Sequence, residues 1–215
     1  KNFDDLGFER VVQTNRSKSC KGVVRGLHFQ QEPKVQAKIV EVIKGSAIDV
    51  VVDMREDSET FGKWTKVLLT EDNNRQLFVP RGFAHGFVSL EDDTIFQYLI
   101  DNDYAPELEG GILWNDPELG INWDEIFKKY DIKEPVLSAK DKVRGSLKDC
   151  DAEFTRKPKK FFITGITGQL GYDLVRELHE RGEYDILAPT IDELDITNRE
   201  QVMNCIKEYK PDTIF

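Results

Sequence analysis

The sequence predicts a mainly β fold followed by a smaller α/β unit, and three features support this division. Residues 20–104 contain short runs rich in β-branched and aromatic residues, separated by turn signals at spacings of about 8–12 residues. Residues 151–159 are charged and poor in apolar side chains, as expected of a linker. Residues 160–190 combine a strand pattern, a glycine-rich turn and an amphipathic helix pattern. We therefore expect a first domain over residues 1–150 and a second over residues 160–215.

Seven segments of the first domain have the composition of strands, and none shows a helical period. They are bounded by turn signals such as "KG", "REDSETFG", "TEDNN", "PRG" and "EDD". In chain order the predicted strands cover residues 22–29, 37–43, 46–54, 64–69, 76–80, 84–90 and 94–100. Strands at this regular spacing are typical of a sandwich or a barrel.

Residues 105–150 are predicted to be mostly loop. This stretch contains Trp114 and Trp123, a short helix over residues 123–130, and the segment "EPVLSAKDK" at residues 134–142. In the second domain, "KFFITG" predicts a strand, "GQLGYDLVRELHERG" an amphipathic helix, and "YDILAPT" a second strand. This order is the start of a βαβ unit.

Composition excludes several classes of protein. The chain has 40 acidic and 30 basic residues and a net charge of -10, so it lacks the positive field on which nucleic-acid binders depend. No apolar run approaches the ~20 residues that a membrane-spanning helix needs, and the first residues do not resemble a secretion signal. Three scattered cysteines form neither a metal-binding spacing nor an even disulfide set. We expect a cytoplasmic protein without nucleic-acid or membrane partners.

Three polar residues stand within predicted strands and could form an acid/base set. Strand alternation places His28 on the same face as Val24 and Gly26, unless the strand is bulged. If that face lines a barrel interior, His28 meets Lys38 and Tyr98 from neighbouring strands. Each residue also has a simpler interpretation: a satisfied histidine, a lysine extending to the rim, and a core aromatic.

Several segments together resemble one enzyme family. They run in order from about residue 8 to residue 145 and read "GVVRGLHFQ", "AKIVEVIKGSAIDVVVDMREDSETFGKW", "NRQLFVPRGFAHGFVSL", "FQYLIDNDYAPELEGGILWNDPELGINW" and "LSAKD". They are similar to dTDP-4-dehydrorhamnose 3,5-epimerases. The resemblance implies a mainly β jelly roll, a cupin-like barrel, and inversion of carbons 3 and 5 of dTDP-4-dehydro-6-deoxy-glucose on the way to L-rhamnose.

The resemblance implies catalytic roles for four residues. His28 in "RGLHF" resembles the catalytic base, and Asp141 in "SAKD" resembles its carboxylate partner. Tyr98 in "FQY" resembles the general acid, and Lys38 the cation near the sugar carbonyl. These roles fit the chemistry, because carbons 3 and 5 both flank the carbon 4 ketone, and loss of either proton leaves an enolate.

The resemblance also implies substrate-binding residues and homodimerisation. The binding residues are Arg25 for the diphosphate, Gln13 and Asn15 for the base or sugar, and His85, Tyr104 and Glu109 in the cleft wall. Family members carry a further strand or two upstream, which exchange between the subunits of a dimer and contact the nucleotide. No cofactor is expected for epimerisation, and two histidines in the barrel without an H-x-H pattern do not make a metal site.

The second domain resembles the N-terminal part of dTDP-4-dehydrorhamnose reductase, an extended short-chain reductase. Gly165, Gly168 and Gly171 lie between the predicted strand and helix, where glycine lets a pyrophosphate approach the helix N-terminus. By the same resemblance, Asp195 approaches the adenine of NAD or NADP. No Tyr-x-x-x-Lys pair follows, so this part of a bifunctional, Rossmann-like enzyme is incomplete. The alternative is a purely structural glycine turn.

Two other functions stay open for the first domain. One is an epimerase that inverts a single carbon of another dTDP-4-keto sugar. The other is a non-catalytic cupin that binds nucleotide sugars, which would need no base and acid pair.

Overall fold

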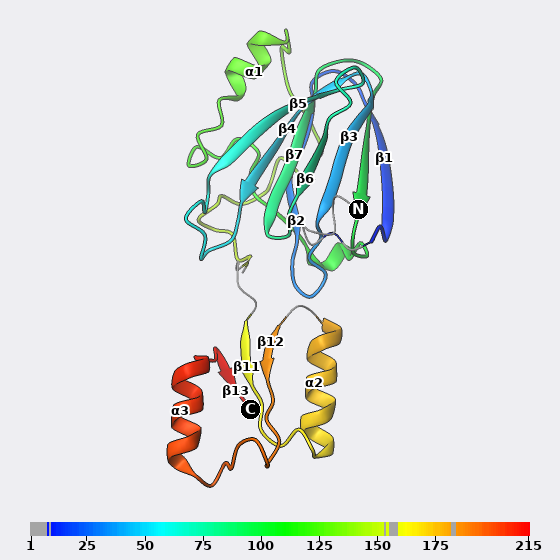
Figure 1. The fold of residues 1–215 in the computed structure, drawn as a ribbon. Coiled ribbons are helices and arrows are strands. Elements are labelled where there is room, and N and C mark those ends of the chain that lie inside the picture. Colours follow the sequence, from blue (N-terminus) through cyan, green and yellow to red (C-terminus); the bar gives the residue numbers. More distant parts are fainter. Residues whose placement is uncertain (1–7, 9, 153, 155–158, 182–183) are drawn as a thin grey trace. The chain divides into compact units, whose positions relative to one another are not determined.

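The computed structural model describes residues 8, 10–152, 154, 159–181 and 184–215 and divides into two compact units (Figure 1). The first unit is Lys1–Arg156 and the second is Lys157–Phe215. The domain boundaries predicted at residues 150 and 160 stay a prediction, since most of the predicted linker lies outside the described residues. Within the described residues, no helix has the length and apolarity that crossing a membrane requires.

Two β-sheets form the first unit, and the predicted mainly β fold is confirmed there. One sheet is antiparallel and has the order β1 (Gln13–Ser19), β8 (Thr94–Ile100), β3 (Lys38–Lys44) and β6 (Gln76–Val79). The other has the order β10 (Val136–Leu137), β2 (Val23–Gln30), β7 (Phe83–Ser89), β4 (Ser46–Asp53) and β5 (Trp64–Thr70), with β9 (Glu109–Gly111) also paired to β2. All seven predicted strands are present.

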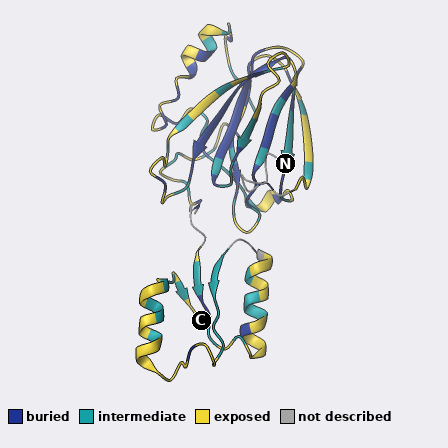
Figure 2. Ribbon diagram, viewed as in Figure 1, coloured by how far each residue is buried: buried dark blue, intermediate teal, exposed yellow. Residues whose placement is uncertain are grey.

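Strand β4 lies at the centre of the first unit, and every one of its residues is buried (Figure 2). Its alternate residues serve two different cores. Ala47 and Val51 join the cluster that includes Val40 and Phe96 of the first sheet. Residues 48, 50 and 52 join a second cluster that includes Trp123. A strand that is buried on both faces needs apolar side chains on both, which explains why most residues of β4 are apolar.

Strand β2 does not alternate regularly, because it contains a β-bulge, the exception named for the predicted alternation. Arg25 pairs with Phe87, but His28 pairs with His85, so β2 carries one extra residue between these pairs. At this point the two strands lie very close: a Cβ on Gly86 would meet the Arg25 carbonyl oxygen at 2.5 Å, and one on Gly26 would meet the Gly86 Cα at 2.6 Å. The extra residue lets Arg25 and His28 face the same cavity.

Several elements of the first unit are absent from the sequence prediction. Strand β1 was missed because its sequence, "QTNRSKS", has no apolar alternation. Strands β9 and β10 have three and two residues, too few to show a period. A 3₁₀ turn, η2 (Pro106–Leu108), precedes β9. The predicted short helix is α1 (Trp123–Lys129), whose N-cap Asn122 accepts a hydrogen bond from the Glu125 amide.

The second unit is a three-stranded parallel sheet flanked by two helices (Figure 1). Strand β11 (Lys160–Phe162) is central, and β12 (Asp185–Leu187) and β13 (Thr213–Ile214) pair with its two edges. Helix α2 (Gln169–Arg181) connects β11 to β12, and α3 (Arg199–Tyr209) connects β12 to β13. The predicted strand–turn–helix–strand order is therefore observed, and α3 and β13 continue it.

We predict that Gly86→Ala lowers the free energy of unfolding of the first unit by about 1–3 kcal/mol, the usual cost of overpacking, because neither facing backbone can move away without breaking the bulge. Tryptophan fluorescence in urea measures this directly, since all three tryptophans (Trp64, Trp114 and Trp123) belong to this unit. The matched control is Gly145→Ala, whose new Cβ would meet no atom closer than 3.7 Å. Equal stability of the two variants would refute the proposed constraint.

Candidate active site

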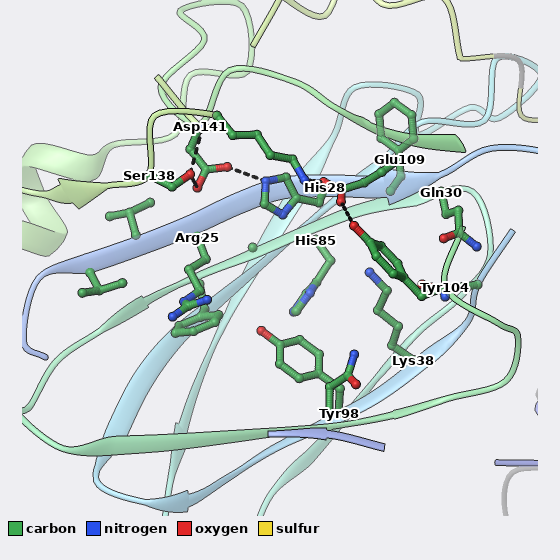
Figure 3. A pocket seen from close by; sticks show the side chains of 18 of the residues that line it. Arg25, His28, Gln30, Lys38, His85, Tyr98, Tyr104, Glu109, Ser138 and Asp141 are labelled. Atoms are coloured by element: carbon green, nitrogen blue, oxygen red, sulfur yellow. Dashed lines mark hydrogen bonds and ion pairs between the residues drawn. The ribbon is translucent and has the colours of Figure 1, made fainter. Parts of the chain in front are cut away.

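A pocket of about 550 Å³ opens between the two sheets of the first unit (Figure 3). Nine of the ten residues predicted for catalysis and substrate binding line it: Asn15, Arg25, His28, Lys38, His85, Tyr98, Tyr104, Glu109 and Asp141. Gln13 is the exception, and its amide nitrogen instead donates a hydrogen bond to Asn15 Oδ1 at 2.7 Å. The fold therefore gathers residues that are up to 126 positions apart, from Asn15 to Asp141, into one cavity.

His28 and Asp141 form a hydrogen-bonded pair at one side of the pocket. His28 Nε2 is bonded to Asp141 Oδ1, and Asp141 is almost fully buried. Ser138 Oγ donates to the other carboxylate oxygen at 2.8 Å. Although burial raises the pKa of Asp141, the hydrogen bond and charge of His28 and the Ser138 hydrogen bond hold it below its ordinary value. Asp141 is thus a carboxylate that orients the imidazole through Nε2, and the structure gives Nδ1 no hydrogen bond to any described residue.

The segment that carries Asp141 is attached to the sheet at two points. Strand β10 pairs in parallel with the start of β2, with Val136 opposite Val23. Further along, Glu109 on β9 bonds to Lys140, and Arg144 donates to the same Glu109 oxygen at 2.9 Å. Because Lys140 and Arg144 flank Asp141 in the chain, Glu109 holds this segment over His28.

Lys38 and Tyr98 lie across the pocket from His28, on β3 and β8 of the first sheet (Figure 3). Burial lowers the pKa of Lys38 to about 8, while the negative charges of Glu109 and Asp49 act in the opposite direction. Burial and the charge of Asp49 raise the pKa of Tyr98, and the charge of Arg25 acts against them. Tyr98 is therefore protonated at neutral pH, and Arg25 is a cation whose charge favours its phenolate.

His85 belongs to a second histidine–aspartate pair. Its Nε2 lies 2.8 Å from Asp49 Oδ2, and both residues are buried. The His85 ring stands edge-on to the Tyr98 ring, with centroids 5.9 Å apart. His85 lines the pocket, whereas Asp49 lies behind it.

The mouth of the pocket is formed by a loop that two glutamines hold in place. Gln30 donates to the Asp103 carbonyl at 2.9 Å and accepts from the Ala105 amide at 2.8 Å. Gln36 donates to the same Asp103 carbonyl at 3.2 Å. Between these anchors, Tyr104 is half exposed and donates its hydroxyl proton to Glu109 at 2.6 Å. An exposed aromatic ring at the mouth of a polar pocket can stack on a planar ligand group.

The second unit holds the four residues predicted to bind a dinucleotide. Gly165 has a φ of +72°, and the Gly168 amide donates to the Gly165 carbonyl at 2.9 Å. A Cβ on Gly171 would meet that carbonyl oxygen at 2.3 Å, so the turn requires glycine there. The carboxylate of Asp195 accepts hydrogen bonds from the backbone amide and hydroxyl of Thr197, which lower its pKa.

Sequence reasoning missed several residues that shape the first pocket. The contact of Ser138 with Asp141 could have been predicted, since S-x-x-D is a known local hydrogen-bonding pattern. Asp49 also carries a signal, because an aspartate among apolar strand residues is unusual. Lys140 and Arg144 carry none. Across the part of the chain that the structure describes, no three His, Cys, Asp or Glu side chains gather as metal ligands would.

Comparison with known proteins identifies both units. Residues 1–149 match the family model of dTDP-4-dehydrorhamnose 3,5-epimerase, and residues 159–215 match the RmlD substrate binding domain. The dTDP-4-dehydrorhamnose 3,5-epimerase of Methanothermobacter thermautotrophicus is 51% identical over 141 residues, covering 65% of this chain and 74% of that protein. The Neisseria gonorrhoeae protein of the same name is 40% identical over 189 residues, covering 84% of this chain and 56% of that protein.

Solved structures agree with the sequence matches. The epimerase from Legionella pneumophila, in complex with dTDP-4-keto-L-rhamnose, has a TM-score of 0.65 and 38% identity, covering 72% of this chain and 81% of that one. A 3'-monoepimerase from Streptomyces bikiniensis, in complex with dTDP-quinovose, has a TM-score of 0.61 and 35% identity, covering 68% and 72%. This chain belongs to the dTDP-4-dehydrorhamnose 3,5-epimerase family and joins that family's unit to a segment of the RmlD type.

Proposed function

We propose that the first unit is an isomerase that inverts carbons 3 and 5 of dTDP-4-dehydro-6-deoxy-glucose, by proton removal and return through an enolate. The observation that carries this proposal is the arrangement of the pocket: a carboxylate-supported imidazole faces a protonated phenol and an amine across one cavity. Members of the family with similar sequences carry the same activity in their names.

His28 serves as the base. Its Nε2 is engaged by Asp141, so Nδ1 takes the proton from carbon 3 or carbon 5. The buried carboxylate stabilises the imidazolium that results, as it does in other histidine–aspartate pairs. The electrons of the broken C–H bond move toward the carbon 4 oxygen, which becomes an enolate oxygen.

Lys38 stabilises the enolate. An amine with a pKa of about 8 is mostly protonated at neutral pH and lies inside the cavity, where a charged donor is worth more than in water. A preorganised donor at a developing oxyanion contributes about 3–4 kcal/mol in enzymes where one has been removed.

Tyr98 returns a proton to the opposite face of the sugar ring. It lies across the cavity from His28, as inversion requires, and its hydroxyl carries a proton at neutral pH. The phenolate left behind is stabilised by the charge of Arg25.

The nucleotide diphosphate part of the substrate occupies the mouth. Arg25 is an exposed cation of the pocket lining, and Asn15 and Tyr104 offer an amide and an aromatic ring for the base or the sugar. Gln13 acts by orienting Asn15. Epimerisation needs no cofactor in this scheme, because every proton donor and acceptor belongs to the chain.

A single-carbon epimerase is the nearest alternative, because a relative with 35% identity is described as a 3'-monoepimerase. The same acid and base would serve both reactions. A non-catalytic sugar-nucleotide-binding protein is less consistent with the pocket, since binding alone needs neither a carboxylate-supported base nor an opposing phenol. NMR of the product formed from dTDP-4-dehydro-6-deoxy-glucose separates the three possibilities.

For the second unit we propose the beginning of a Rossmann-like dinucleotide-binding domain. The glycine turn follows the central parallel strand and leads into α2, the position at which such folds bind a pyrophosphate. Asp195 follows the neighbouring strand β12 and would lie near the adenine. The cofactor is NADP or NAD, and the whole polypeptide would be a bifunctional epimerase and reductase. By family resemblance we also propose a cytoplasmic homodimer formed through the epimerase unit.

Removing the base should stop proton exchange. We predict that His28→Asn abolishes deuterium uptake at carbons 3 and 5 in heavy water, while dTDP binding stays nearly unchanged. The neighbouring carboxylate of Glu109 does not replace the base, because its hydrogen bonds with Lys140 and Tyr104 outweigh burial and hold its pKa below the ordinary value. Mass spectrometry and NMR of the recovered sugar measure the uptake. Continued exchange in the variant would remove His28 from its role.

Removing the carboxylate should impair the base without unfolding the protein. We predict that Asp141→Asn lowers kcat by at least about 100-fold through loss of imidazolium support. Asp149→Asn is a matched control: Asp149 sits in the same S-x-x-D arrangement with Ser146 but does not line the pocket. Equal rates for the two variants would contradict the assignment.

Removing the phenol should separate exchange from inversion. In Tyr98→Phe the ring and its packing remain, so His28 should still exchange the protons at carbons 3 and 5 for deuterium from the solvent. The yield of inverted product should fall by at least about 100-fold, the lower end expected for loss of a general acid. NMR measures both quantities in one sample. Inversion at a near wild-type rate would make Tyr104 or a water molecule the donor.

The second unit should bind a dinucleotide without reducing a sugar. We predict that residues 1–215 bind NADH or NADPH in a fluorescence titration but do not oxidise either one, because the chain contains no Tyr-x-x-x-Lys pair. Gly171→Ala should weaken binding by about 10-fold or more by forcing the Gly165 carbonyl out of the turn. Epimerase activity serves as the internal control. Unchanged binding would support the structural interpretation of the glycines.

A further inference from the structure

Behind the pocket lies a carboxylate to which the proposed mechanism assigns no role. Asp49 stands in the middle of β4 with no exposed surface, between the apolar residues Ile48 and Val50. Strand alternation places it on the same face as Ala47 and Val51, toward the first sheet. It does not line the pocket, so it can act on a substrate only through other residues.

One oxygen of Asp49 is committed to His85, and the other has no partner. Oδ2 lies 2.8 Å from His85 Nε2. Oδ1 is buried and makes no hydrogen bond with any described residue. An incompletely bonded carboxylate inside a core works against folding. A group that is costly for stability and adjacent to a reactive cavity is a candidate for a functional role.

Asp49 lies close enough to Lys38 and Tyr98, the two proposed catalytic residues across the pocket from His28, for its charge to affect the pKa of each. Three titratable side chains face it: His85 on β7, Lys38 on β3 and Tyr98 on β8. The ring of His85 stands edge-on to that of Tyr98, at an interplanar angle of 85°. Two further charges affect these residues: the charge of Arg25 on β2 lowers the pKa of Tyr98, and the charge of Glu109 on β9 raises the pKa of Lys38.

We propose that Asp49 is a positioning residue for epimerisation: its carboxylate fixes the His85 ring against Tyr98 and places a negative charge beside Lys38 and Tyr98. This inference rests on the proposed function of the pocket. Asp49 touches no substrate in this scheme. Its role is to hold the proton donor and the cation ready, as Asp141 does for the base on the other side.

Burial raises the pKa of Asp49 itself, while the charges of His85 and Lys38 and the hydrogen bond with His85 act against that rise. In its ionised form, Asp49 raises the pKa of both Lys38 and Tyr98. Removing that charge lowers both values, so each group loses its proton at a lower pH. Lys38, with a pKa of about 8, titrates first and sets the basic limb of the rate profile. That limb should therefore move toward lower pH when Asp49 is neutralised.

The variant Asp49→Asn tests this, because asparagine has the same shape and no charge. We expect kcat to fall by about 10-fold or more, as it does when a residue that orients a catalytic side chain by a hydrogen bond is removed. The basic limb of kcat/KM should shift by about one unit to lower pH. Binding of dTDP, measured by calorimetry, should stay unchanged, since Asp49 does not line the pocket.

Asp53→Asn is the matched control, because Asp53 is a buried aspartate at the end of the same strand. Its carboxylate accepts hydrogen bonds from Arg55, Ser58 and Thr60, which are not part of the pocket. This variant should lose stability but keep the position of the basic limb. If Asp49→Asn behaves in the same way, with reduced stability and an unmoved limb, Asp49 is purely structural and the inference is wrong.

A measurement on the unaltered protein keeps the inference testable if Asp49→Asn fails to fold. The chain has three histidines, so their ring nitrogens can be assigned by NMR, with His179 as a reference outside the pocket. We expect a slowly exchanging proton between His85 Nε2 and Asp49. A freely exchanging His85 ring would overturn the inference. A wild-type protein that does not epimerise the sugar would instead refute the proposed function, while the NMR result would stand apart from it.

Discussion

The close approach of β2 and β7 at Gly26 and Gly86 is the constraint on which the pocket depends. With no Cβ on either residue, the two backbones pack closely enough for β2 to accommodate one extra residue. The bulge turns Arg25 and His28 toward the same cavity, although regular alternation would put them on opposite faces. The proposed base, His28, and the proposed diphosphate ligand, Arg25, thus owe their common orientation to a backbone packing requirement. The other groups of the pocket are arranged around them.

Around this constraint, the two sheets contribute opposite halves of the chemistry. The sheet that holds β2 and β7 supplies the imidazole of His28, and the returning segment after β10 supplies its carboxylate. The facing sheet supplies Lys38 and Tyr98, whose pKa values burial shifts in opposite directions. Burial disfavours the charged form of both groups, so the amine is easier to deprotonate and the phenol is harder to deprotonate. Burial between the two sheets therefore keeps the proposed proton donor, Tyr98, protonated and lowers the pKa of the proposed cation, Lys38.

The two units of the chain correspond to two families. Residues 1–149 match the epimerase family, and residues 159–215 match the RmlD substrate binding domain. The alignment with the Neisseria gonorrhoeae protein covers 84% of this chain, more than the epimerase unit alone. In the second unit, the parallel order β12-β11-β13 puts the ends of neighbouring strands at one edge, beside the glycine turn. This is the arrangement expected at the start of a dinucleotide-binding fold.

The amino-acid sequence was enough to predict seven of the strands, the order of a β unit followed by an α/β unit, and nine of the ten residues expected in the pocket. Strands β2 to β8 can be predicted because β-branched runs alternate with turn residues. The glycine turn can be predicted because its three glycines lie within seven consecutive residues, 165–171. Family resemblance supplied the roles of Asp141 and Tyr98, which no spacing in the chain suggests.

Only the tertiary structure decided which side chains meet. Strand β1 is polar and pairs with β8 through backbone hydrogen bonds, so its side-chain pattern does not predict a strand. The bulge in β2 depends on a glycine 60 residues away, at position 86. Asp49 reaches His85, Lys38 and Tyr98 because three strands distant in sequence pack around it. Such contacts and the pKa shifts they cause depend on burial and distance in three dimensions, which local sequence patterns do not encode.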